Sequence, residues 1–434
     1  MTEAPREPLS VDDAAILALE SEAIAGHTMK VIVLEPGDEP LSLERLRESV
    51  AARLESEPRA RQRIEVPAEG DQRPCWVVDE QFEIGAQVRL REGAEGGDEE
   101  VMWALAGELM SERLDHRRPL WALDLVGPLD DGRQAIVARI HHAMADGISA
   151  VRFLSGVLWD SEHVAAPAHR SGAAPGEEPP SLGEELLRLP GAMRRELGGH
   201  ASPSPLDRPI GSARALAFTT VPLAELKRIG ASRPGHVTVN DVLLAGVAGG
   251  LRAWLAAMEG GELPALRAQI PVSLHHRDEG DAALGNRDSF LNVDLPLAEA
   301  DPLTRLELIN AETSQRKRLG DAQELYDLFH ALGRFKHLGH AAQRLAGRPR
   351  EFSLSISNVP GPRAAISVAG RAVERLCSVA EPADRHALRV SAISCAGTIG
   401  IGLCTDPEAL AGVAELAGAI DDSFAELRAA AISS

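Results

Sequence analysis

The chain has no excess of positive charge. Its 65 acidic side chains outnumber its 45 basic ones, and the formal net charge at pH 7 is −20. Proteins that bind nucleic acid without sequence preference do so chiefly by neutralising phosphates with lysine and arginine. Because this charge balance opposes such binding and no nucleic-acid motif is present, we expect no nucleic-acid partner.

Long apolar runs are also absent. No stretch of about 18 consecutive apolar residues occurs, so we expect no transmembrane helix. The first residues, Met1 to Pro8, contain no basic segment followed by an apolar one. We therefore expect no signal peptide and a cytoplasmic protein. Contact with a membrane or a lipid inclusion is then expected to be peripheral.

Cysteine is scarce, and its spacing does not suit a metal. The four cysteines have no paired metal-binding spacing and lie among apolar neighbours, which is typical of buried free thiols in a reducing compartment. We expect no catalytic cysteine. The four residues are Cys75, Cys377, Cys395 and Cys404.

The chain is long enough for two domains of ordinary size. It has 434 residues, 44% of them hydrophobic. We expect one half over 1–164, a partly mobile linker rich in Pro, Gly, Ala and Glu over 165–211, and a second half over 212–434. Within the linker, Ser181–Glu184 resembles a capping box that opens a short amphipathic helix, docked on protein or lying on a lipid surface. The mixture of strand and helix patterns predicts an α/β fold.

The most informative segment runs from His141 to Gly147. It follows the apolar stretch Ala135–Ile140, which predicts a strand. Because strand side chains alternate between faces, His141 and His142 point in opposite directions, and only one of them can act as a base. We assign that role to His142, since a neutral imidazole with a pKa near 7 suits proton removal from a group that attacks a carbonyl.

Asp146 and Gly147 predict a tight turn out of this strand. We expect the Asp146 carboxylate to hold the local geometry by pairing with a cation, for example Arg139. Two other interpretations of the histidines remain open. They can be ordinary strand residues with satisfied hydrogen bonds, whereas a metal site fits less well because adjacent strand histidines diverge. We therefore predict no metal.

Other segments have patterns with a structural meaning. Thr238 and Asp241 predict a capped helix N-terminus that also carries Asn240. Strict alternation further along predicts a half-buried strand with a serine face, at Ser355 and Ser357. That strand ends in a rigid turn formed by Asn358, Val359, Pro360, Gly361 and Pro362.

Taken together, these segments resemble a known family. The spacing His-His-x-x-x-Asp-Gly is similar to the signature of CoA-dependent acyltransferases, which include chloramphenicol acetyltransferase and the condensation domains of peptide synthetases. From end to end the chain resembles one branch of that superfamily, the bacterial wax ester synthase/diacylglycerol acyltransferase family. The matching segments, in the family's order, are Arg118-Pro119-Leu120-Trp121, Leu125-Val126-Gly127, Gly132-Arg133, the histidine motif, Thr238 to Leu244, Pro271-Val272-Ser273-Leu274, Gly285-Asn286 and Ser357 to Pro362.

The resemblance implies a fold and an activity. The fold is two chloramphenicol-acetyltransferase-like domains, mixed sheets flanked by helices, with an interdomain tunnel. The activity is transfer of a fatty acyl group from acyl-CoA, a co-substrate rather than a bound cofactor, to the hydroxyl of diacylglycerol or a long-chain alcohol. The product is triacylglycerol or a wax ester, and His142 is the general base.

The resemblance also sorts the candidate residues by role. Asp146 joins His142 as a catalytic-site residue, and His141, Gly147 and Arg139 support the motif. The candidates for binding the oxyanion or the substrate are Asn240, Asp241, Ser355, Ser357 and a backbone amide. The motif residues treated as structural are Pro119, Leu120, Trp121, Asn358, Pro360 and Gly361.

The chain departs from the family pattern at two places. Where the family usually has Ser-Tyr-x-Gly-x-Leu-x-Phe-Gly-Leu, this chain has Cys395 and Ile401 in place of the two aromatics. The proline of an early Pro-Met-His segment is also missing before His27. If those aromatics line the pocket, smaller residues widen it, which predicts tolerance of a bulkier acceptor or acyl chain.

Two alternative functions remain open at this stage. One is an acyltransferase that makes an ester or amide of a specialised metabolite from a CoA or carrier-protein donor. The other is a non-catalytic lipid-inclusion scaffold, although the intact His142 argues against it. Basic clusters at Arg316-Lys317-Arg318 and between Arg334 and Arg350 are either solvated helix faces or contacts for the phosphates of CoA.

Overall fold

The structure is a computed structural model that describes residues 6–66, 73–160, 204–258, 260, 263–273, 288–319 and 352–433. Most of the predicted linker, its amphipathic helix and the basic cluster between Arg334 and Arg350 lie outside these residues.

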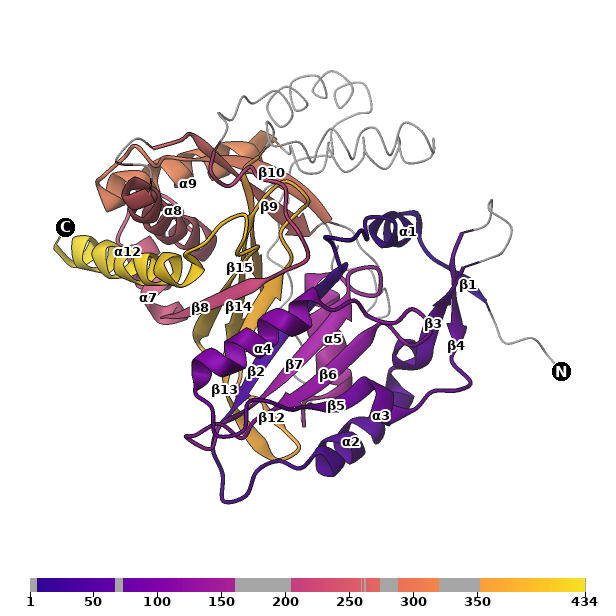
Figure 1. The fold of residues 1–434 in the computed structure, drawn as a ribbon. Helices are drawn as coiled ribbons and strands as arrows, with labels where there is room; N and C mark the ends of the chain where they lie inside the picture. Colours follow the sequence, from indigo (N-terminus) through magenta and orange to yellow (C-terminus); the bar gives the residue numbers. More distant parts are fainter. Residues whose placement is uncertain are drawn as a thin grey trace, which may run out of the picture.

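Two six-stranded sheets form the centre of the molecule (Figure 1). The first consists, in order, of β12 (Ser367–Val368), β13 (Arg371–Ala380), β2 (His27–Leu34), β7 (Gln134–His141), β6 (Trp121–Val126) and β5 (Val88–Arg91). The central strands β2 and β7 are antiparallel, with His27 opposite His141. Every residue of both strands is buried, because helices cover the sheet on both faces.

Helices cover both faces of this first sheet. The helices of this half are α1 (Val11–Leu17), α2 (Leu43–Ala51), α3 (Ile84–Gln87), α4 (Glu99–Ser111) and α5 (Gly147–Val157). One face, which carries Val31 and Val137, packs against α4. The other, which carries Ile136 and Ile140, packs against α5. Beside them lie a small sheet and two 3-10 turns: β1 (Glu7–Pro8), β4 (Cys75–Val78), β3 (Gln62–Glu65), Leu54–Ser56 and Pro58–Arg61.

The second sheet has the same number of strands. In order they are β10 (Asp288–Leu295), β9 (Leu266–Ser273), β11 (Leu354–Val359), β14 (Leu388–Cys395), β15 (Thr398–Thr405) and β8 (Ala215–Pro222). Four helices lie together on one side of it (Figure 1): α7 (Leu223–Ala231), α8 (Val239–Met258), α9 (Pro302–Leu319) and α12 (Val413–Ser433). Of the described helices, α8 alone has the length and hydropathy of a membrane span, and 72% of that span is buried inside the protein.

Helix α8 contains glycines because α12 lies directly against it. A Cβ atom on Gly246 would overlap the ring of Phe424, and one on Gly249 would overlap the side chain of Ser423. The glycine-containing side of α8 is therefore covered by α12, a second helix of the same half.

The two halves are joined by a strand that crosses between them. β13, from the C-terminal part of the chain, pairs antiparallel with β2, and Ala380 lies opposite Thr28. β13 also packs against β15, where a Cβ atom on Gly400 or Gly402 would overlap the backbone carbonyls of β13. Residues 367–380 therefore complete the sheet that carries the histidine motif.

Candidate active site

The histidine motif lies where β7 ends. The N–H of His142 donates to the carbonyl of Gly26 (2.9 Å), in the segment that leads into β2. The chain then turns tightly, because the N–H groups of Met144 and Ala145 both donate to the carbonyl of His141. His142 thus occupies the turn between β7 and α5, and its backbone is held by the neighbouring strand.

Asp146 is the N-cap of α5. Its carboxylate accepts a hydrogen bond from the N–H of Ser149 (2.7 Å), and the residue is only 2% exposed. The expected pairing with Arg139 is wrong. Arg139 projects from β7 on the α4 face, where it donates to the Asp124 carboxylate (3.0 Å) and to the carbonyl of Leu109 (2.9 Å). Asp146 therefore fixes the motif through the helix cap.

Gly147 brings the motif against the second half of the molecule. A Cβ atom at this position would lie 2.8 Å from Cγ2 of Val359, at the end of β11. On β11 the apolar residues Leu354 and Ile356 belong to the core of the second half. Ser355 and Ser357 alternate with these core residues, as the predicted serine face requires.

The serines of β11 already have partners within the second sheet. Ser355 donates to the carbonyl of Gln269 (3.1 Å), and Ser357 donates to the hydroxyl of Ser391 on β14 (3.4 Å). The first hydroxyl is therefore committed to the sheet, whereas the second is held only by a long bond.

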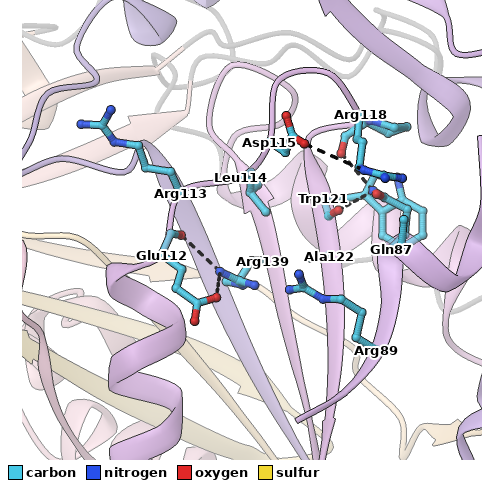
Figure 2. Close-up of a pocket in the computed structure, with 12 residues that line it drawn as sticks. Gln87, Arg89, Glu112, Arg113, Leu114, Asp115, Arg118, Trp121, Ala122 and Arg139 are labelled. Atoms are coloured by element: carbon cyan, nitrogen blue, oxygen red, sulfur yellow. Dashed lines mark hydrogen bonds and ion pairs between the residues drawn. The ribbon is translucent and has the colours of Figure 1, made fainter.

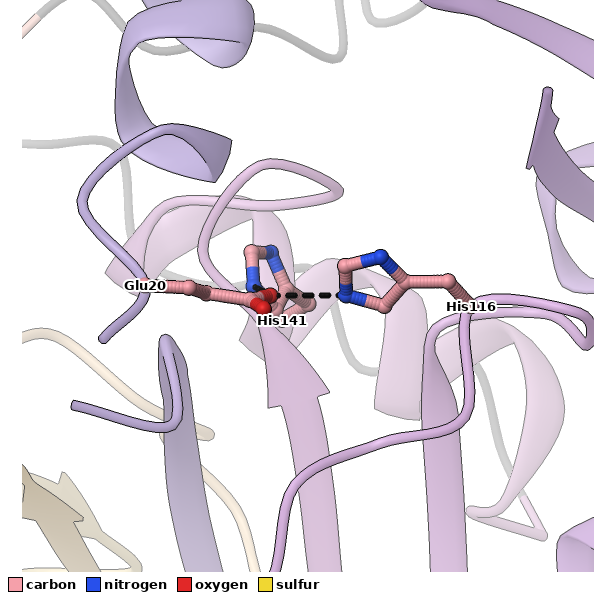
Figure 3. A group of neighbouring side chains, drawn as sticks. All are labelled: Glu20, His116 and His141. Atoms are coloured by element: carbon pink, nitrogen blue, oxygen red, sulfur yellow. Dashed lines mark hydrogen bonds and ion pairs between the residues drawn. The ribbon is translucent and has the colours of Figure 1, made fainter. Parts of the chain in front are cut away.

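His141 belongs to a cluster with Glu20 and His116 (Figure 3). The Glu20 carboxylate lies 2.7 Å from Nε2 of His141 and 2.8 Å from Nε2 of His116. Burial raises the pKa of Glu20, but the hydrogen bonds from His116 and His141 outweigh it and lower that pKa to about 2. The bond to Glu20 in turn raises the pKa of His116. Both partners come from loops far away in the sequence, and neither was predicted.

The cluster fits a hydrogen-bond relay better than a metal site. Nδ1 of His141 accepts a bond from the N–H of Ala143 (3.0 Å). Its proton is therefore on Nε2, where it donates to Glu20, and a ligating nitrogen must be unprotonated. Gly26 completes the packing, because any Cβ atom there would overlap Nε2 of His141.

The His142 imidazole is a weaker base than the predicted pKa near 7 implies. The residue is only partly exposed. Burial, helped by the charges of Arg389 on β14, His141 and Lys30 on β2, lowers the pKa of His142 to about 3, against a smaller opposing effect of Asp146. The ring is therefore unprotonated at neutral pH, which is the form that accepts a proton.

At the start of α8, the predicted capping box is confirmed. The Asp241 carboxylate accepts bonds from the N–H of Thr238 (2.8 Å), the side-chain amide of Asn310 (3.0 Å) and the hydroxyl of Thr313 (2.7 Å). Asp241 is fully buried, so these bonds make it a structural residue. Asn240 is partly exposed in the first turn of the helix.

Known proteins match the chain over most of its length. The profile of the wax ester synthase/diacylglycerol acyltransferase catalytic domain matches residues 9–197, and that of the family's C-terminal domain matches residues 284–428. A probable diacylglycerol O-acyltransferase of Mycobacterium tuberculosis (strain ATCC 25618 / H37Rv) is 30% identical over 405 residues, covering 87% of this chain and 86% of that protein. The chain belongs to the wax ester synthase/diacylglycerol acyltransferase family.

Solved structures with the same fold include a wax ester synthase/diacylglycerol acyltransferase and a condensation domain. The wax ester synthase/diacylglycerol acyltransferase from Marinobacter aquaeolei VT8 superposes with a TM-score of 0.71 at 21% identity, over 98% of this chain and 99% of that one. The first condensation domain of the CDA synthetase gives 0.64 at 15% identity, over 98% and 96%. The predicted α/β fold with two sheet-rich halves is confirmed, and the family identifies the chain as an acyltransferase.

The two missing family aromatics do not occupy equivalent places. Ile401 is fully buried in the core between the second sheet and its helices, away from the first half. Cys395 instead packs, partly buried, against the core cluster that includes α5 and Ile140. Only the substitution at Cys395 bears on the width of a site between the halves, and a wider pocket stays a prediction.

The Pro119-Leu120-Trp121 segment of the family is structural in this chain. Trp121 is 1% exposed, and its Nε1 donates to the carbonyl of Ala60 (2.9 Å). The turn after β11 is similarly tight, because a Cβ atom on Gly361 would overlap the carbonyl of Ser394.

A pocket of about 170 Å³ lies at the edge of the first sheet (Figure 2). Arg139 points into it, together with Glu112, which lies 3.5 Å from that guanidinium. Arg118 and Asp115 form its far wall. His142 does not line this pocket, because Arg139 and His142 project from opposite sides of the sheet. The pocket is therefore separate from the histidine motif.

Proposed function

We propose that this chain transfers a fatty acyl group from acyl-CoA to the hydroxyl of diacylglycerol or a long-chain alcohol, and so forms triacylglycerol or a wax ester. Membership of the family and the names of its relatives support this substrate class. Acyl-CoA is a substrate in this scheme, and no resident cofactor is required. The acceptor is a lipid in this scheme, so we also propose that the protein is cytoplasmic and makes peripheral contact with a membrane or a lipid inclusion.

The observation that carries the mechanism is the position of His142. It lies in a turn at the contact between the two halves, and its ring is unprotonated at neutral pH. In the proposed reaction the ring takes the proton of the acceptor hydroxyl while the oxygen attacks the thioester carbonyl. The tetrahedral oxyanion then collapses, the C–S bond breaks, and the imidazolium returns its proton to the leaving thiolate. No acyl-enzyme is needed, because a thioester is already activated.

The remaining motif residues position this base. Asp146 caps α5 and ends the turn, and Gly26 holds the His142 backbone through its carbonyl. The Glu20 carboxylate is hydrogen-bonded to the ring of the adjacent residue, His141, and holds it in place. Two segments distant in sequence therefore fix the turn on either side of the proposed base.

The test is an assay of the purified chain with palmitoyl-CoA and either hexadecanol or diacylglycerol, with thiol release and ester product both measured. We expect His142→Ala to lower turnover by about 10²–10⁴-fold, the usual contribution of a general base. His236→Ala, which removes an exposed imidazole, is the control. Thiol release without ester product contradicts the proposed function. Full activity of the His142 variant contradicts the proposed mechanism.

A further inference from the structure

A buried lysine lies on β2, the strand paired with the one that ends at the proposed base. Lys30, in the middle of β2, is 1% exposed. Its Nζ donates to the hydroxyl of Thr28 (2.9 Å), and that hydroxyl in turn donates to the carbonyl of Val379 (3.1 Å). An ammonium group has three N–H donors. Among the described residues, Thr28 is the only hydrogen-bond acceptor for the Lys30 ammonium, so two of its buried N–H donors lack acceptors there.

The side chain of Lys30 extends toward the histidine motif. Lys30 lies opposite Ala138 on β7, and Thr28 lies opposite Ile140, one step closer to the end of that strand. The bond to Thr28 therefore draws the ammonium in the direction of His142. Both residues lie on the α5 face of the sheet, since Ala138 and Ile140 belong to the core cluster on that face.

The charged side chain that acts on Lys30 is itself positive. No carboxylate among the described residues pairs with it. Burial lowers the pKa of Lys30 to about 7, and Arg389, which approaches from β14 of the second half, contributes to the lowering. Lys30 and Arg389 both act on His142 in the same way. A desolvated cation without an anion is costly, so this arrangement suits a position where negative charge forms transiently.

The proposed reaction places negative charge in this region. When the hydroxyl oxygen bonds to the thioester carbon, the carbonyl π electrons move onto the carbonyl oxygen while the hydroxyl proton moves to His142. The resulting ion pair has an imidazolium on one side and an oxyanion on the other. The positive surroundings oppose the imidazolium, and an oxyanion within reach of the ammonium offsets that penalty.

We infer that Lys30 is a further catalytic residue, whose ammonium donates a hydrogen bond to the thioester carbonyl oxygen as that oxygen becomes the tetrahedral oxyanion. This inference rests on the proposed function. The protonated form of Lys30 is the active one and transfers no proton in the step, and its bond to the oxygen weakens when the carbonyl re-forms and the thiolate leaves. Ser355, a candidate for this role on sequence grounds, is instead committed to the sheet.

The experiment compares Lys30→Met and Lys30→Gln with the wild type, measuring kcat, KM for palmitoyl-CoA and thermal unfolding. Methionine has a similar length without charge or donors, and glutamine keeps a neutral donor. We expect kcat to fall by about 10²–10³-fold in Lys30→Met, as for loss of one oxyanion donor, and by less in Lys30→Gln. KM stays within a few-fold of the wild-type value. Lys227→Met, which removes an exposed lysine from α7, is the charge-matched control.

Stability separates a catalytic role from a structural one. Removing an unpaired buried charge should leave the unfolding temperature of Lys30→Met unchanged or higher, while its activity falls. Loss of activity together with a lower unfolding temperature in both variants overturns the inference, because Lys30 then supports the fold. A rise in KM with unchanged kcat in Lys30→Met also overturns the inference, and so does a wild-type kcat in that variant. If the wild type itself forms no ester, the proposed function fails instead.

Discussion

Replacing Glu20 with glutamine should reduce stability at neutral pH and impair turnover. The Glu20 carboxylate accepts bonds from both His141 and His116, and its pKa falls from 4.5 to about 2 in the folded protein. A shift of this size corresponds to about 3 kcal/mol of folding free energy. Because the group is not fully buried, solvent screening reduces this, and we expect Glu20→Gln to lose about 1–2 kcal/mol at pH 7.

The loss of stability in Glu20→Gln should depend on pH in a definite direction. The pKa of Glu20 is lowered in the folded state, so its contribution is complete above the unfolded value of 4.5 and is lost as pH falls toward about 2. Urea unfolding of both proteins should therefore show a difference in free energy at pH 7 that shrinks to less than half at pH 3. Glu22→Gln, at an exposed position nearby, should match the wild type at both pH values.

Turnover is a second property of the Glu20→Gln variant that can be measured. The His141 ring is next to the turn that holds His142, and misplacing a reacting group by 1 Å costs about 10²-fold in rate. We expect kcat of Glu20→Gln to fall by about 10-fold or more, with KM for acyl-CoA unchanged. Equal unfolding free energies at pH 7, or a difference that does not change between pH 7 and pH 3, would refute this account of the cluster.

Two further predictions concern the helix cap and the thiols. Asp146→Ala should destabilise the protein by about 1 kcal/mol through loss of the α5 cap and lower kcat, whereas Asp146→Asn keeps the cap and should lose less stability than the alanine variant; equal stability of the alanine variant and the wild type would contradict the capping role. Burial raises the pKa of both Cys377 and Cys404 to about 12, so iodoacetamide at pH 8 should modify the partly exposed Cys75 long before either of them; mass spectrometry showing equal rates would contradict their burial.

Local patterns identified the parts of the site that lie in continuous segments. The apolar run before His141 became β7, and Thr238 with Asp241 became the capping box of α8. Such signals are readable because each depends on neighbouring side chains and on backbone periodicity. The serine face at Ser355 followed from alternation for the same reason.

Contacts between distant segments were not predictable in this way. Glu20 and His141 are 121 positions apart, and no local pattern connects a loop carboxylate with that ring. Arg139 does not pair with Asp146, although the two are near in sequence, because the strand sends the Arg139 side chain to the opposite face, where Asp124 and the carbonyl of Leu109 bind it. The low pKa of His142 depends first on burial and then on the charges of Arg389 and Lys30, and only the assembled sheets produce this burial and bring these charges near.

The origin of β13 has a consequence for synthesis of the protein on the ribosome. The histidine motif emerges early, but the strand that covers one edge of β2 emerges only with residues 371–380. Until then the nascent chain has an open strand edge, which is a template for pairing with other chains. A truncation just upstream of Arg371 would remove an inner strand from the sheet that bears His142, rather than a dispensable tail. We expect such products to aggregate or to be degraded.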